Sequence, residues 1–145
     1  TPKPSSAASD VYKRQQGRHG LNVPNLRRRA FRKGHHAEAV AAIWLRLKGY
    51  RILARRFRCR VGEVDIIARR GAVLAIVEVK ARSEVTVAVD AVQSAAWRRI
   101  EAAADVWRVR HPQPETLSMR YDIVAVTSAF RLRHLAGAWQ PNRYK

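Results

Sequence analysis

The chain has 145 residues, which is enough for one domain with a single hydrophobic core. Its 29 lysine and arginine residues outnumber 11 aspartate and glutamate residues, and the net charge of +18 favours a polyanionic partner, nucleic acid before an anionic membrane surface. A single cysteine excludes an intrachain disulfide and a multi-cysteine zinc site, and no apolar run approaches the roughly 18 residues that span a bilayer. These features predict a cytoplasmic protein without a membrane span.

The composition changes near Ala30. Residues 1–29 are polar and basic and lack hydrophobic periodicity, which predicts a disordered basic leader or sequence foreign to the domain. We therefore expect a single domain over residues 30–140, followed by a tail at residues 141–145.

The domain begins with a predicted helix over residues 31–50, which ends at Gly49. Its apolar residues at helical spacing are Ala37, Val40, Trp44 and Leu47. Alternation of apolar and polar residues, turn residues and a second stretch of helical spacing predict the later elements. They are strands at 50–58, 62–70 and 72–82, a helix at 89–111, a strand at 120–128 and a short fifth strand at 131–137. This order predicts an α/β protein with helices flanking a sheet.

Three charged residues lie inside the two central apolar strands: Asp65, Glu78 and Lys80. If Arg70 and Gly71 form the two-residue hairpin loop, Asp65 lies opposite Ile76 and diagonal to Glu78. Because strand residues alternate between faces, all three charged side chains then project from one face. Two carboxylates at that spacing can share one divalent cation, and a nearby lysine can stabilise charge on a phosphate. An ordinary ion pair between Lys80 and an acid explains the same pattern.

This pattern, following an acid-bearing helix, resembles the PD-(D/E)XK, or restriction-endonuclease-like, superfamily. Residues 34–126 are more closely similar to the YraN family of uncharacterised bacterial proteins. The segments that carry the resemblance are "GHHAEAVAAIWLRLKGYRIL", "FRCRVGEVDIIAR", "VEVKAR" and "RYDIVAV".

The resemblance implies a restriction-endonuclease-like mixed sheet in the order helix-strand-strand-strand-helix-strand. It also implies a nuclease or nucleic-acid-binding role, with Mg²⁺ or Mn²⁺ as cofactor. The residues that match the catalytic positions are Glu38, Asp65, Glu78 and Lys80, with Asp65 and Glu78 as the metal ligands. From its place on the helix, Glu38 either faces the sheet or is an exposed acid near the helix start.

Arginine clusters supply the candidate contacts to DNA or RNA phosphates. They are Arg56, Arg58, Arg60, Arg82, Arg98 and Arg99. Trp97 either stacks on a base or packs in the core. Glu63 and Asp122 are interpreted as structural, Glu63 as the partner of an arginine, and His134 as isolated.

Three functions remain open at this point. The first is a Mg²⁺- or Mn²⁺-dependent endonuclease or exonuclease that hydrolyses phosphodiester bonds. The second is a non-catalytic nucleic-acid-binding module on the nuclease fold. The third is a protein-interaction or membrane-associated role for the basic surface.

Overall fold

The computed structural model describes residues 23–81, 94–127 and 131–141, with residues 23–33 described in their backbone alone. The chain divides into two units, residues 1–31 and 32–145, and the second contains the whole sheet. The elements are α2 (Val23–Leu47), β1 (Arg51–Cys59), β2 (Gly62–Arg70), β3 (Val73–Ala81), α4 (Ser94–Arg110), β4 (Ser118–Val126) and β5 (Leu132–Trp139).

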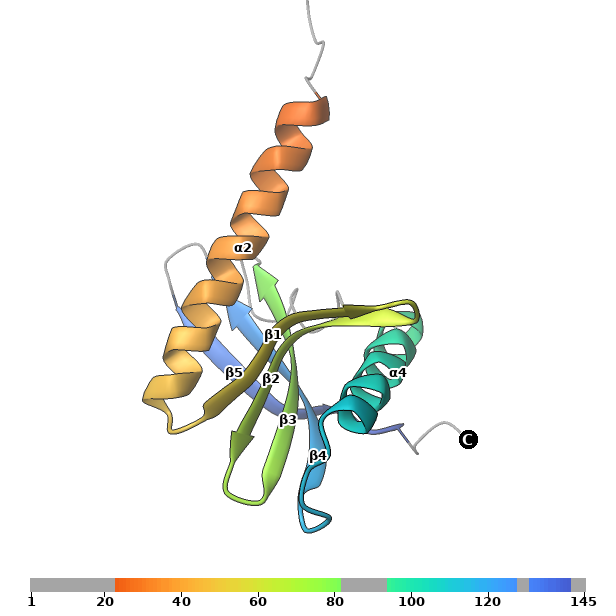
Figure 1. Cartoon of the computed structure of the whole chain (residues 1–145). Coiled ribbons are helices and arrows are strands. Elements are labelled where there is room, and N and C mark those ends of the chain that lie inside the picture. Colours follow the sequence, from red (N-terminus) through yellow and green to blue (C-terminus); the bar gives the residue numbers. More distant parts are fainter. Residues whose placement is uncertain (1–22, 82–93, 128–130, 142–145) are drawn as a thin grey trace, which may run out of the picture. The chain divides into compact units, whose positions relative to one another are not determined.

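The five strands form one mixed sheet in the order β1-β2-β3-β4-β5 (Figure 1). Only the β3–β4 pair is parallel, because α4 provides the crossover between these strands, and the other neighbours are antiparallel. The predicted order of the first six elements is confirmed, and β5 adds a full eight-residue strand. This architecture matches the predicted restriction-endonuclease-like core.

Hydrophobic side chains cover both faces of the sheet, and of the described helices α2 lies on one face and α4 on the other. On one face, Ala41 and Leu45 of α2 pack against strand residues such as Ile66 and Val77. On the other face, α4 packs through a second cluster of buried residues. The members of this second cluster are Val64, Ile67, Leu74, Ile76, Trp97, Ile100, Ala103, Ala104, Trp107, Tyr121 and Ile123. The central strands are therefore apolar on both sides.

Helix α2 ends at the predicted glycine. Gly49 has a φ of +87°, and the amides of Gly49 and Tyr50 donate to the carbonyls of Arg46 and Leu45, which is a Schellman motif. Ala37, Val40 and Trp44 pack in the core as predicted, but the predicted helix start and the predicted burial of Leu47 differ from the structure. The helix begins at Val23, inside the segment predicted to be a disordered leader, and Leu47 is 82% exposed because it lies in the last turn, beyond the sheet contact.

The β2–β3 hairpin is shifted by two residues from its predicted register. Arg70 pairs with Val73, so the loop is Gly71 and Ala72 rather than Arg70 and Gly71. The φ of +56° at Gly71 explains the difference, because glycine takes the positive-φ first loop position and leaves Arg70 in the strand. A shift of two residues preserves which face each side chain takes, but it places Asp65 beside Glu78 instead of diagonal to it.

Among the described residues, no helix is long and apolar enough to cross a membrane.

Candidate functional site

Asp65 of β2 and Glu78 of β3 line one cleft of about 510 Å³. The cleft lies between the turn that joins β1 to β2 and the first turns of α4, from which Ala96 and Arg99 contribute. The residues that line it are Arg58, Cys59, Arg60, Val61, Gly62, Glu63, Asp65, Glu78, Ala96 and Arg99. The structure therefore brings together the two acids that the strand pattern predicted to share a face.

The cleft does not provide Asp65 with enough positive charge to stabilise its carboxylate. The backbone amide of Val79 donates to Asp65 Oδ2 at 2.8 Å. Burial, and next the negative charge of Glu78, nevertheless raise the pKa of Asp65 from 3.8 to about 8. The neighbouring charge of Glu38 acts in the same direction. Without a cation, Asp65 is mostly protonated at neutral pH.

Lys80 forms an ion pair with the second acid. Its Nζ lies 2.9 Å from Glu78 Oε1, and the side chains are 22% and 16% exposed. The ion pair that was the simpler explanation of the sequence pattern is therefore present. The ion pair does not separate the two acids, because Glu78 still lies beside Asp65.

Glu38 comes from α2 and is only 9% exposed, so it faces the sheet rather than solvent. Arg56 of β1 donates from Nε to Glu38 Oε2 at 2.5 Å. Arg56 has a φ of +52°, the only positive value at a non-glycine residue in the described part of the chain. This left-handed conformation costs about 1 kcal/mol for a residue with a Cβ atom. Arg56 was predicted to contact phosphate, but in the structure its side chain lies on Glu38.

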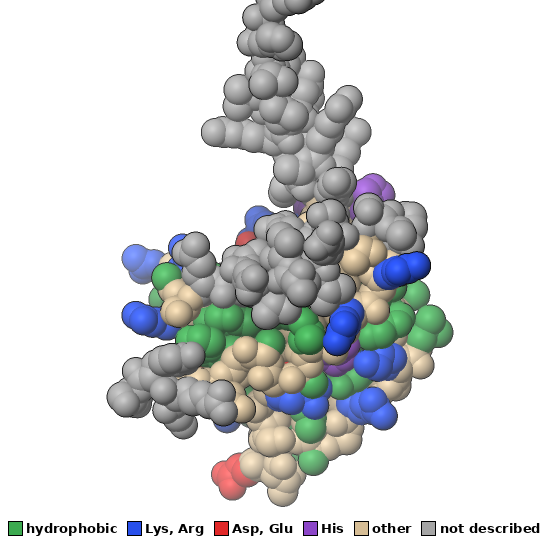
Figure 2. Space-filling model, turned by 180° about the vertical axis from the view of Figure 1, so that it is seen from behind, with side chains coloured by type: hydrophobic (Ala, Val, Ile, Leu, Met, Phe, Trp, Pro, Cys, Tyr) green, Lys and Arg blue, Asp and Glu red, His purple; other side chains and the backbone are tan. Residues whose placement is uncertain are grey.

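The other predicted phosphate-binding arginines are more open. Arg60, Arg98 and Arg99 are exposed, whereas Arg58 pairs with Glu63 at 3.0 Å, which confirms the structural interpretation of Glu63. Arg82 lies outside the described residues. On the face opposite the view of Figure 1, lysine and arginine side chains are widely spread and acidic side chains are few (Figure 2).

Trp97 does not form an open surface for a base. It is 3% exposed, stacks on Trp139 with ring centroids 5.8 Å apart, and meets Tyr121 edge to face. Trp139 also donates through Nε1 to Glu101 of α4, so the aromatic pair links β5 to the helix. Of the two roles that the sequence left open for Trp97, the structure shows core packing.

The approach of α4 to the cleft depends on a glycine. A Cβ atom on Gly62 would lie 2.3 Å from the backbone oxygen of Arg99, which is far inside the contact limit. Glycine at the start of β2 therefore lets the helix backbone reach the strand and holds Arg99 at the rim of the cleft.

A buried polar network lies outside the cleft, and sequence reasoning found only one of its members. Asp122 is fully buried, and its carboxylate accepts hydrogen bonds from Arg120, from His134 Nε2 at 2.7 Å and from the Gly137 amide. These bonds hold the pKa of Asp122 below its usual value despite burial. Asp122 is therefore structural, as predicted. His134 was wrongly predicted to be isolated, since nothing in its local sequence indicates a partner on another strand.

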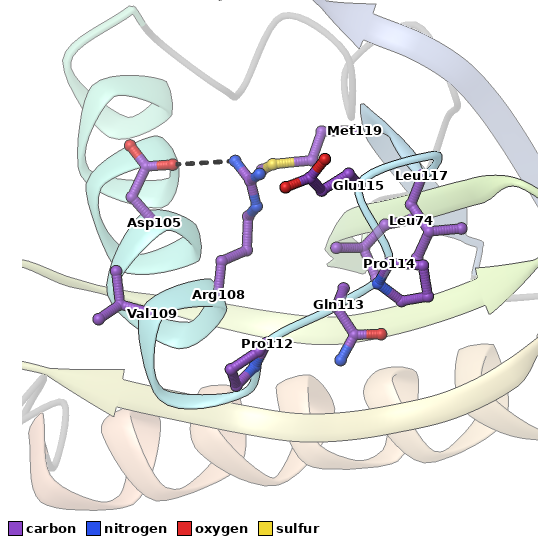
Figure 3. A pocket seen from close by; sticks show the side chains of 10 residues that line it. All are labelled: Leu74, Asp105, Arg108, Val109, Pro112, Gln113, Pro114, Glu115, Leu117 and Met119. Carbon is purple, nitrogen blue, oxygen red and sulfur yellow. Dashed lines mark ion pairs between the residues drawn. The ribbon is translucent and has the colours of Figure 1, made fainter.

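A second hollow, of about 400 Å³, lies at the other end of α4 (Figure 3). Its polar side chains include Asp105 and Arg108, which form an ion pair at 3.9 Å, and its floor includes Leu74 and Met119. None of the predicted site residues lines it. This hollow is therefore separate from the residues predicted to form the site.

The donor set in the cleft fits one Mg²⁺ or Mn²⁺ ion. Within the described residues, no group of three or more His, Cys, Asp and Glu side chains is arranged to hold a metal. Mg²⁺ in proteins commonly uses only one or two carboxylates and completes its coordination with water and substrate phosphate. Asp65 and Glu78 supply such a pair, and their mutual repulsion is the condition that a cation relieves.

Comparison with known proteins gives one consistent family. The model of the family described as "Uncharacterised protein family UPF0102" matches residues 37–126. A UPF0102 protein of Chelativorans sp. (strain BNC1) is 60% identical over 107 residues, which cover 74% of this chain and 86% of that protein. A UPF0102 protein of Rhizobium etli (strain CIAT 652) is 54% identical over 114 residues, 79% of this chain and 93% of the relative. One of Sinorhizobium medicae (strain WSM419) is 53% identical over 115 residues, covering 79% and 94%.

Proposed function

The chain belongs to the uncharacterised protein family UPF0102, which is the YraN family that its motifs resemble. The family name states no activity, so we propose a function from the site itself. We propose that the protein is a Mg²⁺- or Mn²⁺-dependent nuclease that hydrolyses phosphodiester bonds in DNA or RNA. The observation that carries the proposal is that Asp65 and Glu78 line one cleft together with Arg60 and Arg99, while Lys80 forms an ion pair with Glu78.

Each of the three residues has a distinct part. Asp65 and Glu78 hold the divalent cation, which supplies positive charge for the phosphate and a more acidic bound water. Lys80 is held near this position by its ion pair with Glu78, from which its ammonium group can also donate to a phosphate oxygen. The Val79 amide orients the Asp65 carboxylate.

The surroundings of the cleft favour an extended polyanion. Arg60 and Arg99 line the cleft, and Arg98 is exposed on the same helix. The first turns of α4 also face the cleft, and the partial positive charge of a helix N-terminus favours phosphate there. A chain of net charge +18 adds an attraction that does not depend on sequence.

One observation favours a non-catalytic nucleic-acid-binding module as the second candidate. Lys80 is paired with Glu78, and Glu38 is paired with Arg56, so two of the site carboxylates already have cationic partners. A protein that uses the fold only to bind nucleic acid would retain these ion pairs and need no cation.

A cleavage screen separates the two candidates. Purified protein is incubated with single-stranded, duplex and branched DNA and with RNA, in Mg²⁺, Mn²⁺ or EDTA. We expect cation-dependent products from the wild type and none from Asp65→Asn. Lys80→Ala is expected to be slower by about 10²-fold, the scale of losing one charge-stabilising donor. Binding without cleavage of any substrate in either cation would favour the non-catalytic module.

Binding measured in EDTA tests the interface independently of catalysis. Each phosphate contact that is lost lowers the slope of log affinity against log salt by about one unit. We therefore expect Arg60→Ala and Arg99→Ala to flatten the slope. Arg51→Ala is the matched control, because this exposed arginine begins β1 at the end away from the cleft and its removal should change the slope less.

A further inference from the structure

We infer that Arg56 acts as a built-in counter-cation for Glu38, so that the cleft takes a single divalent cation on Asp65 and Glu78 while Glu38 is withheld from it. This inference rests on the proposed cation-dependent function and specifies the stoichiometry of the same site. It assigns Arg56 a positioning role, in place of the phosphate contact that the sequence predicted.

The backbone of β1 directs Arg56 toward Glu38. Arg55 pairs with Ile66 and Phe57 pairs with Val64, so Arg56 lies across from Asp65 at the centre of this stretch. The left-handed φ of +52° departs from strand geometry at that residue, although the pairing with β2 keeps the same register on both sides of it. An unfavourable conformation at a non-glycine residue persists only where the surrounding contacts enforce it.

The ion pair is sheltered from water. The side chains of Arg56 and Glu38 are 29% and 12% exposed, and their Nε–Oε2 separation is 2.5 Å. Solvent screens a partly buried pair much less than a surface pair, and removing one partner leaves an uncompensated buried charge. The guanidinium of Arg56 therefore balances the charge of Glu38 in surroundings that water screens little.

Glu38 is near the cation site without belonging to it. The negative charge of Glu38 contributes to the raised pKa of Asp65, but Glu38 is not among the described residues that line the cleft. Arg56 lies against Glu38 and Lys80 lies against Glu78, so each of these two carboxylates faces one cation. A divalent ion on Asp65 and Glu78 would therefore not need Glu38, and an ion bound to Glu38 would have to displace the guanidinium of Arg56.

Mn²⁺ titration by calorimetry, with electron paramagnetic resonance of the free ion, tests this inference without reference to activity. The proteins compared are wild type, Glu38→Gln, Arg56→Asn, Arg56→Lys, the Glu38→Gln/Arg56→Asn double variant and Asp65→Asn. Asparagine tolerates a positive φ, so Arg56→Asn removes the cation with little backbone penalty, whereas Arg56→Lys keeps the charge.

We expect one Mn²⁺ per wild-type chain. Arg56→Lys, which keeps the positive charge, and the double variant, which removes both charges of the pair, should bind Mn²⁺ within about threefold of wild type. Glu38→Gln should bind one Mn²⁺ more weakly, because the positive charge of Arg56 is then unbalanced. Arg56→Asn should bind Mn²⁺ at least about tenfold more tightly or take a second equivalent, because it exposes an unbalanced carboxylate. The double variant should lose that gain.

Two results would overturn the inference while leaving a cation site in place. They are a loss of more than about tenfold in Mn²⁺ affinity for the double variant, or two equivalents in wild type that fall to one in Glu38→Gln, as expected if a carboxylate ligand is lost. The Mn²⁺ stoichiometries of wild type and Glu38→Gln decide the question even if the variants with Arg56→Asn do not fold. If neither wild type nor any variant binds Mn²⁺, the proposed function fails, and the inference fails with it.

Discussion

Replacing Asp65 by asparagine removes a carboxylate whose ionisation the fold opposes. Burial and the charge of Glu78 raise its pKa from 3.8 to about 8. Between these values the folded protein holds a proton that the unfolded chain has released, so the free energy of unfolding falls as the pH rises from about 4 to about 8. Above that range both states are ionised, and the contribution no longer changes with pH.

The magnitude follows from the size of the shift. One pKa unit corresponds to about 1.4 kcal/mol, so raising the pH from 5 to 7 should cost the wild type about 3 kcal/mol relative to Asp65→Asn. Urea unfolding at both pH values in EDTA measures this difference. The asparagine oxygen can still accept the hydrogen bond that Val79 donates, so the variant isolates the charge.

Cys59→Ser is the matched control, because it changes a residue of the same cleft and retains a hydroxyl donor toward the Gly62 carbonyl. Its pH dependence should follow that of the wild type. Saturating Mn²⁺ at pH 8 should stabilise the wild type and Cys59→Ser but not Asp65→Asn. Parallel pH profiles for the wild type and Asp65→Asn would show that the fold does not oppose ionisation of Asp65, and would remove the electrostatic reason for a cation.

Two further predictions concern residues that position the site. Asp122→Asn should lower the free energy of unfolding by about 3–5 kcal/mol, because it leaves Arg120 and His134 without their buried acid. Urea unfolding measures this loss. The Mn²⁺ affinity of the folded variant should change little. Gly62→Ala should lower the free energy of unfolding by about 1–3 kcal/mol, because the alanine methyl group would meet the Arg99 carbonyl. A fluorescence titration with labelled nucleic acid should show weaker binding. Unchanged stability and affinity would mean that α4 need not approach β2 so closely.

Residues near one another in the sequence were predicted well, because local rules govern them. The two-residue period of a strand determines which side chains share a face, so Asp65 and Glu78 were expected together before their strand register was known. Gly49 ends α2 through its own backbone conformation. The hairpin register was wrong by two residues because Arg70 and Gly71 were placed in the loop, and only the shift by an even number left the acid pair intact.

The sequence by itself determined the family, the order of elements and the acids that share the cleft, because its motifs and periodicities encode them locally. Tertiary structure decided which charged side chains form ion pairs within the protein and which remain open to a ligand. Arg56 looked like any other surface arginine, yet contact with α2 turns it onto Glu38, 18 residues earlier in the chain. His134 finds Asp122 only when β5 pairs with β4. Ion pairs depend on distances between elements rather than on spacing within one, and those distances exist only once the helices have packed on the two faces of the sheet.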